Sequence, residues 1–229
     1  RSLDHGEAND YAKGTWRGGD LLRRAQDLSG LPVSAFCSDL IMAPSRFAGQ
    51  INIPDAFTRL VVSLVSTGLA PRTFYADDGS GERPRAHYDG LPADFVADAV
   101  TTIGGHSLHG FRSYDVMNPH DDGISLDVIV DWLIDAGIPI TRVDDHAEWV
   151  ARFEGALRAL PEQQRQRSAL ALLDAYRQPE QPLLGALAPT AVFREAVRAA
   201  KIGPAQDIPH ITVELIHKYL TDLRKLGVI

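Results

Sequence analysis

The amino-acid sequence predicts an α/β fold in which a short parallel-sheet part is followed by a mostly helical part. The first observation is a helical stretch over residues 11–29 that ends at Gly30 and leads, through a Gly-Leu-Pro turn, into the apolar run 33–43. A short apolar run after a helix and a tight turn is typical of a buried parallel strand. The second observation is that helical periodicity dominates the rest of the chain. We therefore predict two domains, residues 1–118 and residues 119–229.

The helix over residues 11–29 has one apolar face. Leu21, Leu22, Ala25 and Leu28 recur at helical spacing, and Gly30 can cap the C-terminal end. The other elements expected in the first part are a helix over 53–68, a turn over 77–81, a helix over 93–103 and a strand over 111–118. The turn contains Gly-Ser-Gly with no third glycine, so we interpret it as a hairpin tip and not as a phosphate-binding loop.

The second part reads as a series of helices separated by prolines. Thr212 is a candidate N-cap for the last of them, because a threonine side chain can accept a hydrogen bond from a free backbone N–H of the first turn. The expected helices span residues 125–136, 145–160, 162–176, 189–201 and 212–226. The sequence therefore predicts a helical lobe that follows the α/β part.

Composition narrows the class of protein. The 229 residues include 45% hydrophobic and 23% charged residues, which is ordinary for a globular protein. The formal net charge of -7 argues against a nucleic-acid partner, and no apolar run approaches the ~20 residues that cross a bilayer. The single cysteine, Cys37, fits the reducing cytoplasm. Because the chain lacks an initiating methionine, we expect it to derive from a longer protein.

Tyr11 is the first candidate catalytic residue. A tyrosine followed by lysine four residues later on one helix is the core of short-chain dehydrogenase chemistry, because the cation lowers the tyrosine pKa from its ordinary value near 10. Here the fourth residue is Thr15, and Lys13 lies on another face of the helix. From these residues alone, a tyrosine that packs against the sheet stays an equally open interpretation.

For the other reactive side chains, the sequence context favours structural roles. His106 and His109 lie three residues apart and His120 precedes Asp121 and Asp122, whereas a metal site would need three or four converging ligands. We therefore expect no metal. Cys37 lies in the apolar strand, so we expect a buried small side chain there. The paired aspartates at 77–78, 121–122 and 144–145 lie near turns or helix starts, where caps are expected.

Several collinear segments carry a resemblance to a known family. They are Gly-Leu-Pro-Val at 30–33, Ser-Asp-Leu-Ile-Met-Ala at 38–43, Ala-Gly-Gln-Ile-Asn-Ile-Pro-Asp at 48–55, Arg-Ala-His-Tyr-Asp-Gly-Leu-Pro at 85–92, Val-Met-Asn-Pro-His-Asp-Asp-Gly-Ile at 116–124, Ala-Lys-Ile-Gly-Pro at 200–204, Asp-Ile-Pro-His at 207–210 and the closing Leu-Gly-Val-Ile. From about Tyr11 to Ile229, the sequence resembles the thioester reductase (R) domain of carboxylic acid reductases and of nonribosomal peptide and polyketide synthases.

The resemblance implies a fold and a reaction. The fold is a truncated Rossmann-like, extended short-chain dehydrogenase with a mostly helical C-terminal substrate lobe. The reaction is the reduction of an acyl thioester, carried on the phosphopantetheine arm of an acyl carrier domain, to an aldehyde with NADPH. The family pattern implies Tyr11 as proton donor to the developing oxyanion. It also implies that Ser38, Asp39 and Leu40 lie beside the nicotinamide. His87, Tyr88 and Asp89 are implied at the substrate site, where the two lobes meet.

Two departures from the family bear on activity. The family lysine falls at Thr15, and the family usually has arginine at Cys37. We expect the glycine fingerprint that holds the cofactor pyrophosphate to lie upstream of Arg1, in a missing N-terminal Rossmann half. The NADPH site is then incomplete in this chain, and the chain alone is expected to be inactive. The alternative is a non-catalytic or degenerate lobe that docks a substrate or a carrier domain.

Overall fold

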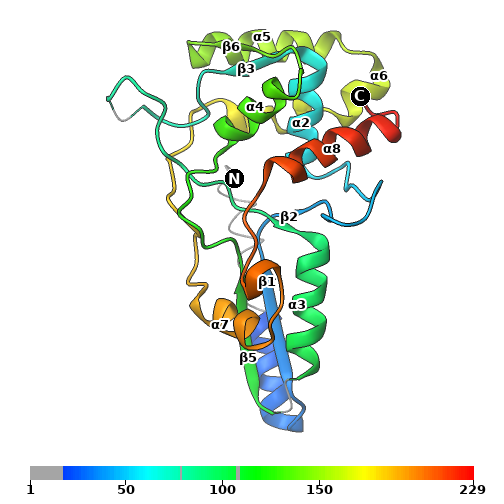
Figure 1. Ribbon diagram of the computed structural model, residues 1–229, viewed down its shortest axis with the longest axis vertical. Coiled ribbons are helices and arrows are strands. Elements are labelled where there is room, and N and C mark those ends of the chain that lie inside the picture. Colours follow the sequence, from blue (N-terminus) through cyan, green and yellow to red (C-terminus); the bar gives the residue numbers. More distant parts are fainter. Residues whose placement is uncertain (1–17, 78, 107–108) are drawn as a thin grey trace. The chain divides into compact units, whose positions relative to one another are not determined.

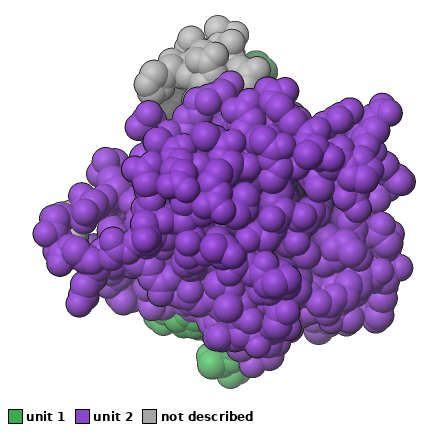
Figure 2. Space-filling model, turned by 90° about the horizontal axis from the view of Figure 1, so that it is seen from above, with its two compact units in different colours: residues 1–41, 89–119, 186–210 green, residues 42–88, 120–185, 211–229 purple. Residues whose placement is uncertain are grey.

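The computed structural model describes residues 18–77, 79–106 and 109–229 (Figure 1). It confirms the predicted α/β class, because helices alternate with short strands that pair in parallel. The chain divides into two compact units, each built from separate stretches of sequence (Figure 2). The described residues of 1–41, 89–119 and 186–210 form unit 1, and residues 42–88, 120–185 and 211–229 form unit 2. The division into domains at residue 118 stays a prediction, because a compact unit is not by itself a folding domain.

Unit 1 is built on a parallel pair of strands. β1 (Val33–Ser38) pairs with β5 (Phe111–Val116), with Val33 opposite Phe111 and Ser38 opposite Val116. The preceding helix is described from residue 18 to residue 29. Gly30 ends it in the left-handed region, at φ +72°, and its N–H donates to the Gln26 carbonyl oxygen at 2.8 Å. The predicted C-terminal cap is therefore confirmed.

Two helices cover one face of this strand pair. α3 (Ala93–Gly105) and α7 (Ala191–Ala199) pack over β1 and β5, as Figure 1 shows. The stacked rings of Phe36 and Tyr114, 5.0 Å apart, lie beneath them. The buried core consists of Leu91, Phe95, Val96, Ala99, Ile103, Tyr114, Val116, Phe193, Val197 and Ile208. Shorter elements in this part of the chain are β2 (Ile41–Met42), β4 (Leu91–Pro92) and the 3₁₀ turn Pro204–Gln206.

The predicted strand over residues 33–43 is too long. The chain bends at Asp39, so β1 ends at Ser38 and a separate two-residue strand follows. The burial predicted for Cys37 is also wrong, since every residue of β1 is half-buried. Within the described ranges β1 pairs only with β5, which leaves its other edge uncovered by a strand. An edge strand is open to solvent on one side, which agrees with the partial exposure of β1.

Unit 2 joins helices to a second parallel pair that the sequence did not predict. β3 (Leu69–Pro71) follows α2 (Ala56–Thr67) in the chain and pairs with β6 (Thr141–Val143). Gly68 makes this junction possible. Its φ is +66°, and a Cβ there would lie 2.9 Å from the Pro139 carbonyl oxygen. The remaining helices are α4 (Leu126–Asp135), α5 (His146–Ala159), α6 (Glu162–Arg167) and α8 (Val213–Lys225).

The single helix predicted over residues 162–176 is wrong. α6 ends at Arg167, Ser168 is extended, and a 3₁₀ helix, η1 (Ala169–Tyr176), follows. The break is held by α2. Arg59 donates to the carbonyl oxygens of Gln166 and Ser168 at 2.8 and 2.9 Å, and the Ala169 N–H donates to Ser63 Oγ at 2.7 Å. These bonds replace those that a continuous helix would make.

The last helix confirms its prediction. α8 begins after Thr212, whose side chain accepts from the Leu215 N–H at 3.3 Å. Tyr219 lies on its buried face, and the Tyr219 hydroxyl accepts from the Ala43 N–H at 2.7 Å. No helix within the described ranges is long and apolar enough to span a membrane.

Candidate functional site

The carboxyl ends of β1 and β5 form the first part of the candidate site. Ser38 is the last residue of β1, and Asp39 and Leu40 follow it directly. In open parallel α/β sheets, ligands bind outside the carboxyl ends of the strands. The three residues predicted to lie beside the nicotinamide therefore occupy the expected edge of the strand pair, although their contact with a cofactor stays a prediction.

Hydrogen bonds draw two further segments to this edge. Asp89 Oδ1 accepts from the Asn118 N–H at 2.8 Å, just beyond the end of β5. The Leu40 carbonyl oxygen accepts from the Leu91 N–H at 3.1 Å. Residues 38–40, 89–91 and 116–118 thus form one group, which we call the strand-end cluster. Asn118, fully buried, was not predicted as a site residue, although it lies in the Val-Met-Asn-Pro segment that carries the resemblance.

His87 and Tyr88 belong to unit 2, whereas Asp89 belongs to unit 1. The buried His87 ring lies with Nδ1 3.5 Å from Asp122 Oδ1. The Tyr88 N–H donates to the Ile124 carbonyl oxygen at 2.8 Å. The three residues predicted at the substrate site are therefore divided between the two units, with the unit boundary between Tyr88 and Asp89.

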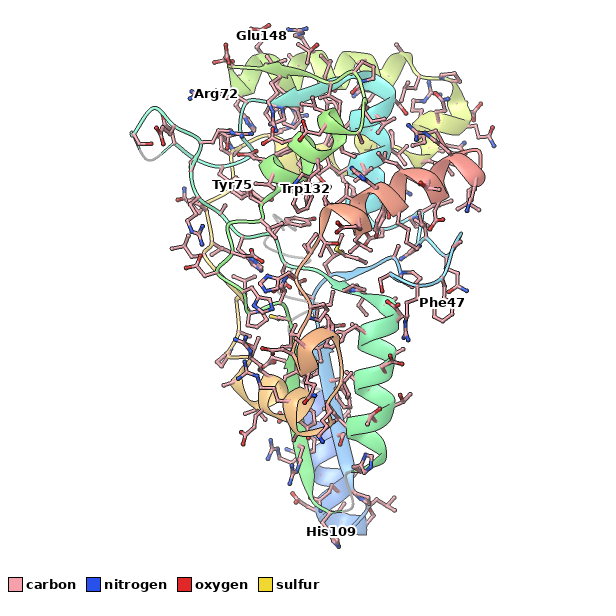
Figure 3. The ribbon with its side chains drawn as sticks, in the orientation of Figure 1. Phe47, Arg72, Tyr75, His109, Trp132 and Glu148 are labelled. Carbon is pink, nitrogen blue, oxygen red and sulfur yellow. The ribbon has the colours of Figure 1, made fainter. Side chains whose placement is uncertain are left out.

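Buried phenols surround Tyr88, and the sequence did not predict them. Burial raises the pKa of Tyr88 well above 10, and the nearby phenols of Tyr176 and Tyr75 and the carboxylate of Glu180 raise it further. Burial likewise raises the pKa values of Tyr75 (labelled in Figure 3) and Tyr176. These phenols stay protonated near neutral pH, so they can donate hydrogen bonds but cannot act as bases.

The predicted catalytic residues lie outside the described residues. Tyr11 and Thr15, like Lys13, precede residue 18, where the description begins. Their arrangement relative to the strand-end cluster is therefore a prediction that no contact tests.

The helix starts of the described chain do not suit a pyrophosphate. A phosphate cradle needs unoccupied N–H groups at a helix N-terminus, usually after a glycine-rich turn. Asp55 Oδ1 already accepts from the first N–H groups of α2, and Asp145 Oδ1 accepts from the Glu148 N–H of α5. Ser125 and Thr212 cap α4 and α8 in the same way, and α3 has the acidic Asp94 in its first turn. The N-termini of α3, α6 and α7 carry no side-chain cap, but none of them directly follows a glycine-rich turn.

Metal ligation finds no support in the same residues. No three histidine, cysteine, aspartate or glutamate side chains within the described ranges converge as a metal site would require. The acidic pairs have structural partners instead: Asp121 pairs with Arg85 at 2.7 Å, and Asp77 accepts from the Gly79 N–H at 2.8 Å.

A parallel strand pair with its candidate site at the strand carboxyl ends is the arrangement found in α/β proteins of the dinucleotide-binding class. Residues 1–100 match the model of an NAD-binding family described as "Male sterility protein". Over 229 residues the chain is 54% identical to a carboxylic acid reductase of Mycobacterium marinum, covering all of this chain and 20% of that protein. It is 51% identical to an isonitrile lipopeptide synthase of Mycobacterium tuberculosis, covering 10% of it.

Solved structures agree with the sequence comparison. The reductase domain of a nonribosomal peptide synthetase from Mycobacterium tuberculosis superposes with a TM-score of 0.90 at 50% identity, over all of this chain and 54% of that one. Over its whole length the chain matches a part of the reductase domain of carboxylic acid reductases and nonribosomal peptide synthetases. It spans about a fifth of the carboxylic acid reductases it matches and about half of the solved reductase domain.

Proposed function

We propose that this chain is the substrate-side part of an NADPH-dependent thioester reductase, and that the whole enzyme reduces carrier-bound acyl thioesters to aldehydes. The observation that carries this proposal is the 54% identity to a carboxylic acid reductase over the entire chain. The strand-end cluster supports it, because segments far apart in the sequence meet where a parallel sheet binds its ligand.

In the proposed reaction this chain positions the acyl group and supplies a proton. The hydride comes from NADPH when it is bound. Tyr11 donates to the oxyanion that develops on the thioester carbonyl, and Ser38, Asp39 and Leu40 form the wall beside the nicotinamide. His87, Tyr88 and Asp89 contribute to the substrate site, where the neutral Tyr88 phenol can donate a hydrogen bond. The phosphopantetheine arm of a carrier domain delivers the substrate.

A non-catalytic docking lobe is the second candidate function. Thr15 favours it, because threonine lacks the charge that lowers the tyrosine pKa and holds the nicotinamide ribose. The side-chain caps of α2 and α5 favour it as well, since they occupy N–H groups that a phosphate cradle would need. Such a lobe would bind an acyl chain or a carrier domain without reducing it.

Restoring the cation distinguishes the two candidates. We join the chain to the glycine-loop half of a related reductase domain and measure NADPH oxidation with a small acyl thioester. Thr15→Lys should raise turnover by roughly 10²–10⁴-fold, the range typical of a positioned acid–base group. Tyr11→Phe in the Thr15→Lys background should abolish that gain.

Lys13 provides the control. If Lys13 supplies the cation in place of Thr15, then Thr15→Lys changes little and Lys13→Ala removes activity. Equal turnover in the Thr15→Lys, Tyr11→Phe and Lys13→Ala variants would show that Tyr11 is structural, and would favour the docking lobe.

A further inference from the structure

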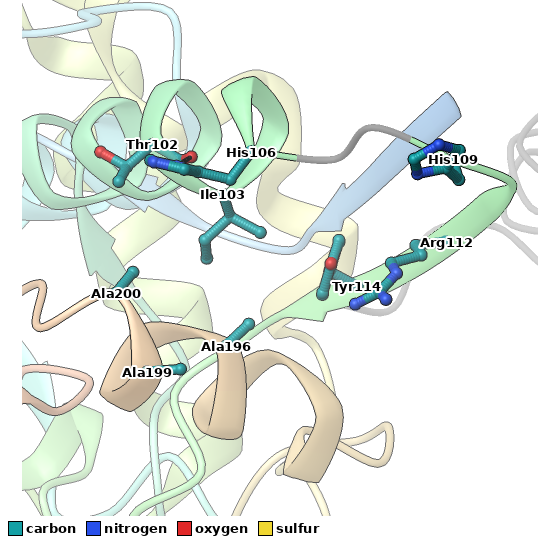
Figure 4. A pocket seen from close by; sticks show the side chains of 9 residues that line it. All are labelled: Thr102, Ile103, His106, His109, Arg112, Tyr114, Ala196, Ala199 and Ala200. Atoms are coloured by element: carbon teal, nitrogen blue, oxygen red, sulfur yellow. Dashed lines mark hydrogen bonds between the residues drawn. The ribbon is translucent and has the colours of Figure 1, made fainter. Parts of the chain in front are cut away.

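Unit 1 contains a pocket of about 650 Å³ at the opposite end of β5 from Asn118. It lies where the C-terminal turn of α3, the first half of β5 and the C-terminal half of α7 meet (Figure 4). We call it the α3–α7 pocket. From Arg112 to Asn118 the chain covers roughly 20 Å at the rise of a strand, so the pocket is not part of the strand-end cluster. No residue of β1 lines it, so a strand added at the uncovered edge of β1 leaves the lining intact.

The floor of the α3–α7 pocket is apolar. Ile103 and Tyr114 line it from the core of unit 1, where both residues are buried. Ala196 and Ala199, with Ala200, form the α7 wall, and their small side chains leave the space open. The volume lies within the ~300–1,000 Å³ typical of small-molecule sites, which are mostly apolar with a few polar groups.

The rim of the pocket is basic. His106, His109 and Arg112 line it, and none of its described lining residues is an aspartate or a glutamate. His106 is engaged locally, because Nδ1 donates to the Thr102 carbonyl oxygen at 2.6 Å near the end of α3. Arg112 is exposed, and no carboxylate pairs with it among the described residues. In a chain of net charge -7, an unpaired guanidinium over an apolar floor is complementary to an organic anion.

The helix ends around the pocket oppose a doubly charged anion more strongly than a singly charged one. Phosphate sites use the N–H groups of helix N-termini, where the helix dipole is positive. Here both α3 and α7 contribute C-terminal residues, whose carbonyl groups carry partial negative charge. A dianion is therefore disfavoured relative to a carboxylate.

We propose that the α3–α7 pocket binds a small organic carboxylate. The carboxylate pairs with the fork of Arg112, and the apolar part of the ligand lies on Ile103 and Tyr114. The proposal adds a ligand site near the N-terminal end of β5 and does not depend on the proposed reductase activity.

The test uses the full chain and ligand-observed NMR with hexanoate as the probe. A ligand of this size should bind with a dissociation constant on the order of 1 mM. Arg112→Ala should weaken binding by about tenfold or more, because it removes a charge-assisted pair. Ala199→Phe should block binding by filling the space while leaving every charge in place. Arg224→Ala, at an exposed arginine of α8, is the matched control and should bind as the unaltered chain does.

Two further probes, one uncharged and one doubly charged, define outcomes that overturn the proposal. Hexanamide should not bind, so equal binding of hexanoate and hexanamide excludes recognition of the charge. Tighter binding of hexyl phosphate than of hexanoate excludes the carboxylate class. Unchanged hexanoate affinity in both Arg112→Ala and Ala199→Phe, with Tm values equal to that of the unaltered chain, places the ligand elsewhere.

Discussion

Among single residues, Asp207 joins two arginines of one helix. Its carboxylate accepts from Arg194 at 2.7 Å and from Arg198 at 2.6 Å, and both arginines lie on α7. It also accepts from the Ile208 N–H at 2.9 Å. Hydrogen bonds from Arg194, and then from Arg198, hold the pKa of Asp207 well below its ordinary value. Asp207 therefore fixes α7, one wall of the α3–α7 pocket, to the segment that follows it.

The lowered pKa of Asp207 predicts a pH-dependent stability. A carboxyl group whose pKa is lower in the folded state stabilises the fold above its unfolded pKa, near 4, and loses this contribution as pH falls through the folded value. We expect Asp207→Asn to lower the free energy of unfolding by about 1 kcal/mol at pH 7, allowing for solvent screening. The difference should shrink below about pH 4 in urea titrations. Asp135→Asn, at an exposed residue of α4, should cost nothing at either pH.

Site residues were predictable only where the resemblance supplied them. Ser38, Asp39 and Leu40 were placed at a strand end, and that placement agrees with the structure. The buried phenol of Tyr75 was not predictable, because its hydroxyl accepts from the Leu126 N–H, which is distant in the sequence. A side chain that is buried by segments distant in the sequence leaves no recognisable pattern in the residues around it.

At the scale of elements, local signals predicted α8 well. Its apolar spacing and the threonine before it are contained within fifteen residues, and both the helix and the cap are present. The break after α6 depends instead on Arg59 and Ser63, more than a hundred residues away. The β3–β6 pair also escaped prediction, since each strand has three residues and gains its pairing only from the other.

The N-cap of α8 gives a prediction with a control in the same helix. Thr212→Ala removes the acceptor for the Leu215 N–H and should lower the free energy of unfolding by about 1 kcal/mol. Thr221 is exposed in the middle of α8, and its hydroxyl only donates back to the His217 carbonyl oxygen at 3.0 Å. Thr221→Ala should be neutral or slightly stabilising, because alanine has the higher helix propensity. Equal losses in urea denaturation would contradict the cap assignment.

At the scale of the whole molecule, unit 1 exposes the surfaces that a larger parallel sheet would bury. All six residues of β1 are half-buried, and its second edge has no partner strand among the described residues. The helix that precedes β1 carries Leu21 at 66% exposure and Leu28 at 90%, followed by Leu31 at 66%. Burying one such leucine stabilises a structure by about 1.5–3 kcal/mol, so this surface favours association. An open strand edge adds to that tendency.

These surfaces and the capped helix starts lead to one prediction for the chain as a whole. Alone, it should form dimers or larger aggregates in light scattering and bind NADPH weakly or not at all, because side-chain caps occupy the N-termini of α2, α4, α5 and α8. Co-expression with the half of the Mycobacterium tuberculosis reductase domain that this chain does not cover should yield a one-to-one complex. Isothermal titration should then give a dissociation constant for NADPH in the low micromolar range. The same affinity for the chain alone would show that it holds a complete cofactor site. A monomer that unfolds cooperatively at high temperature would show that the exposed strand edge needs no partner.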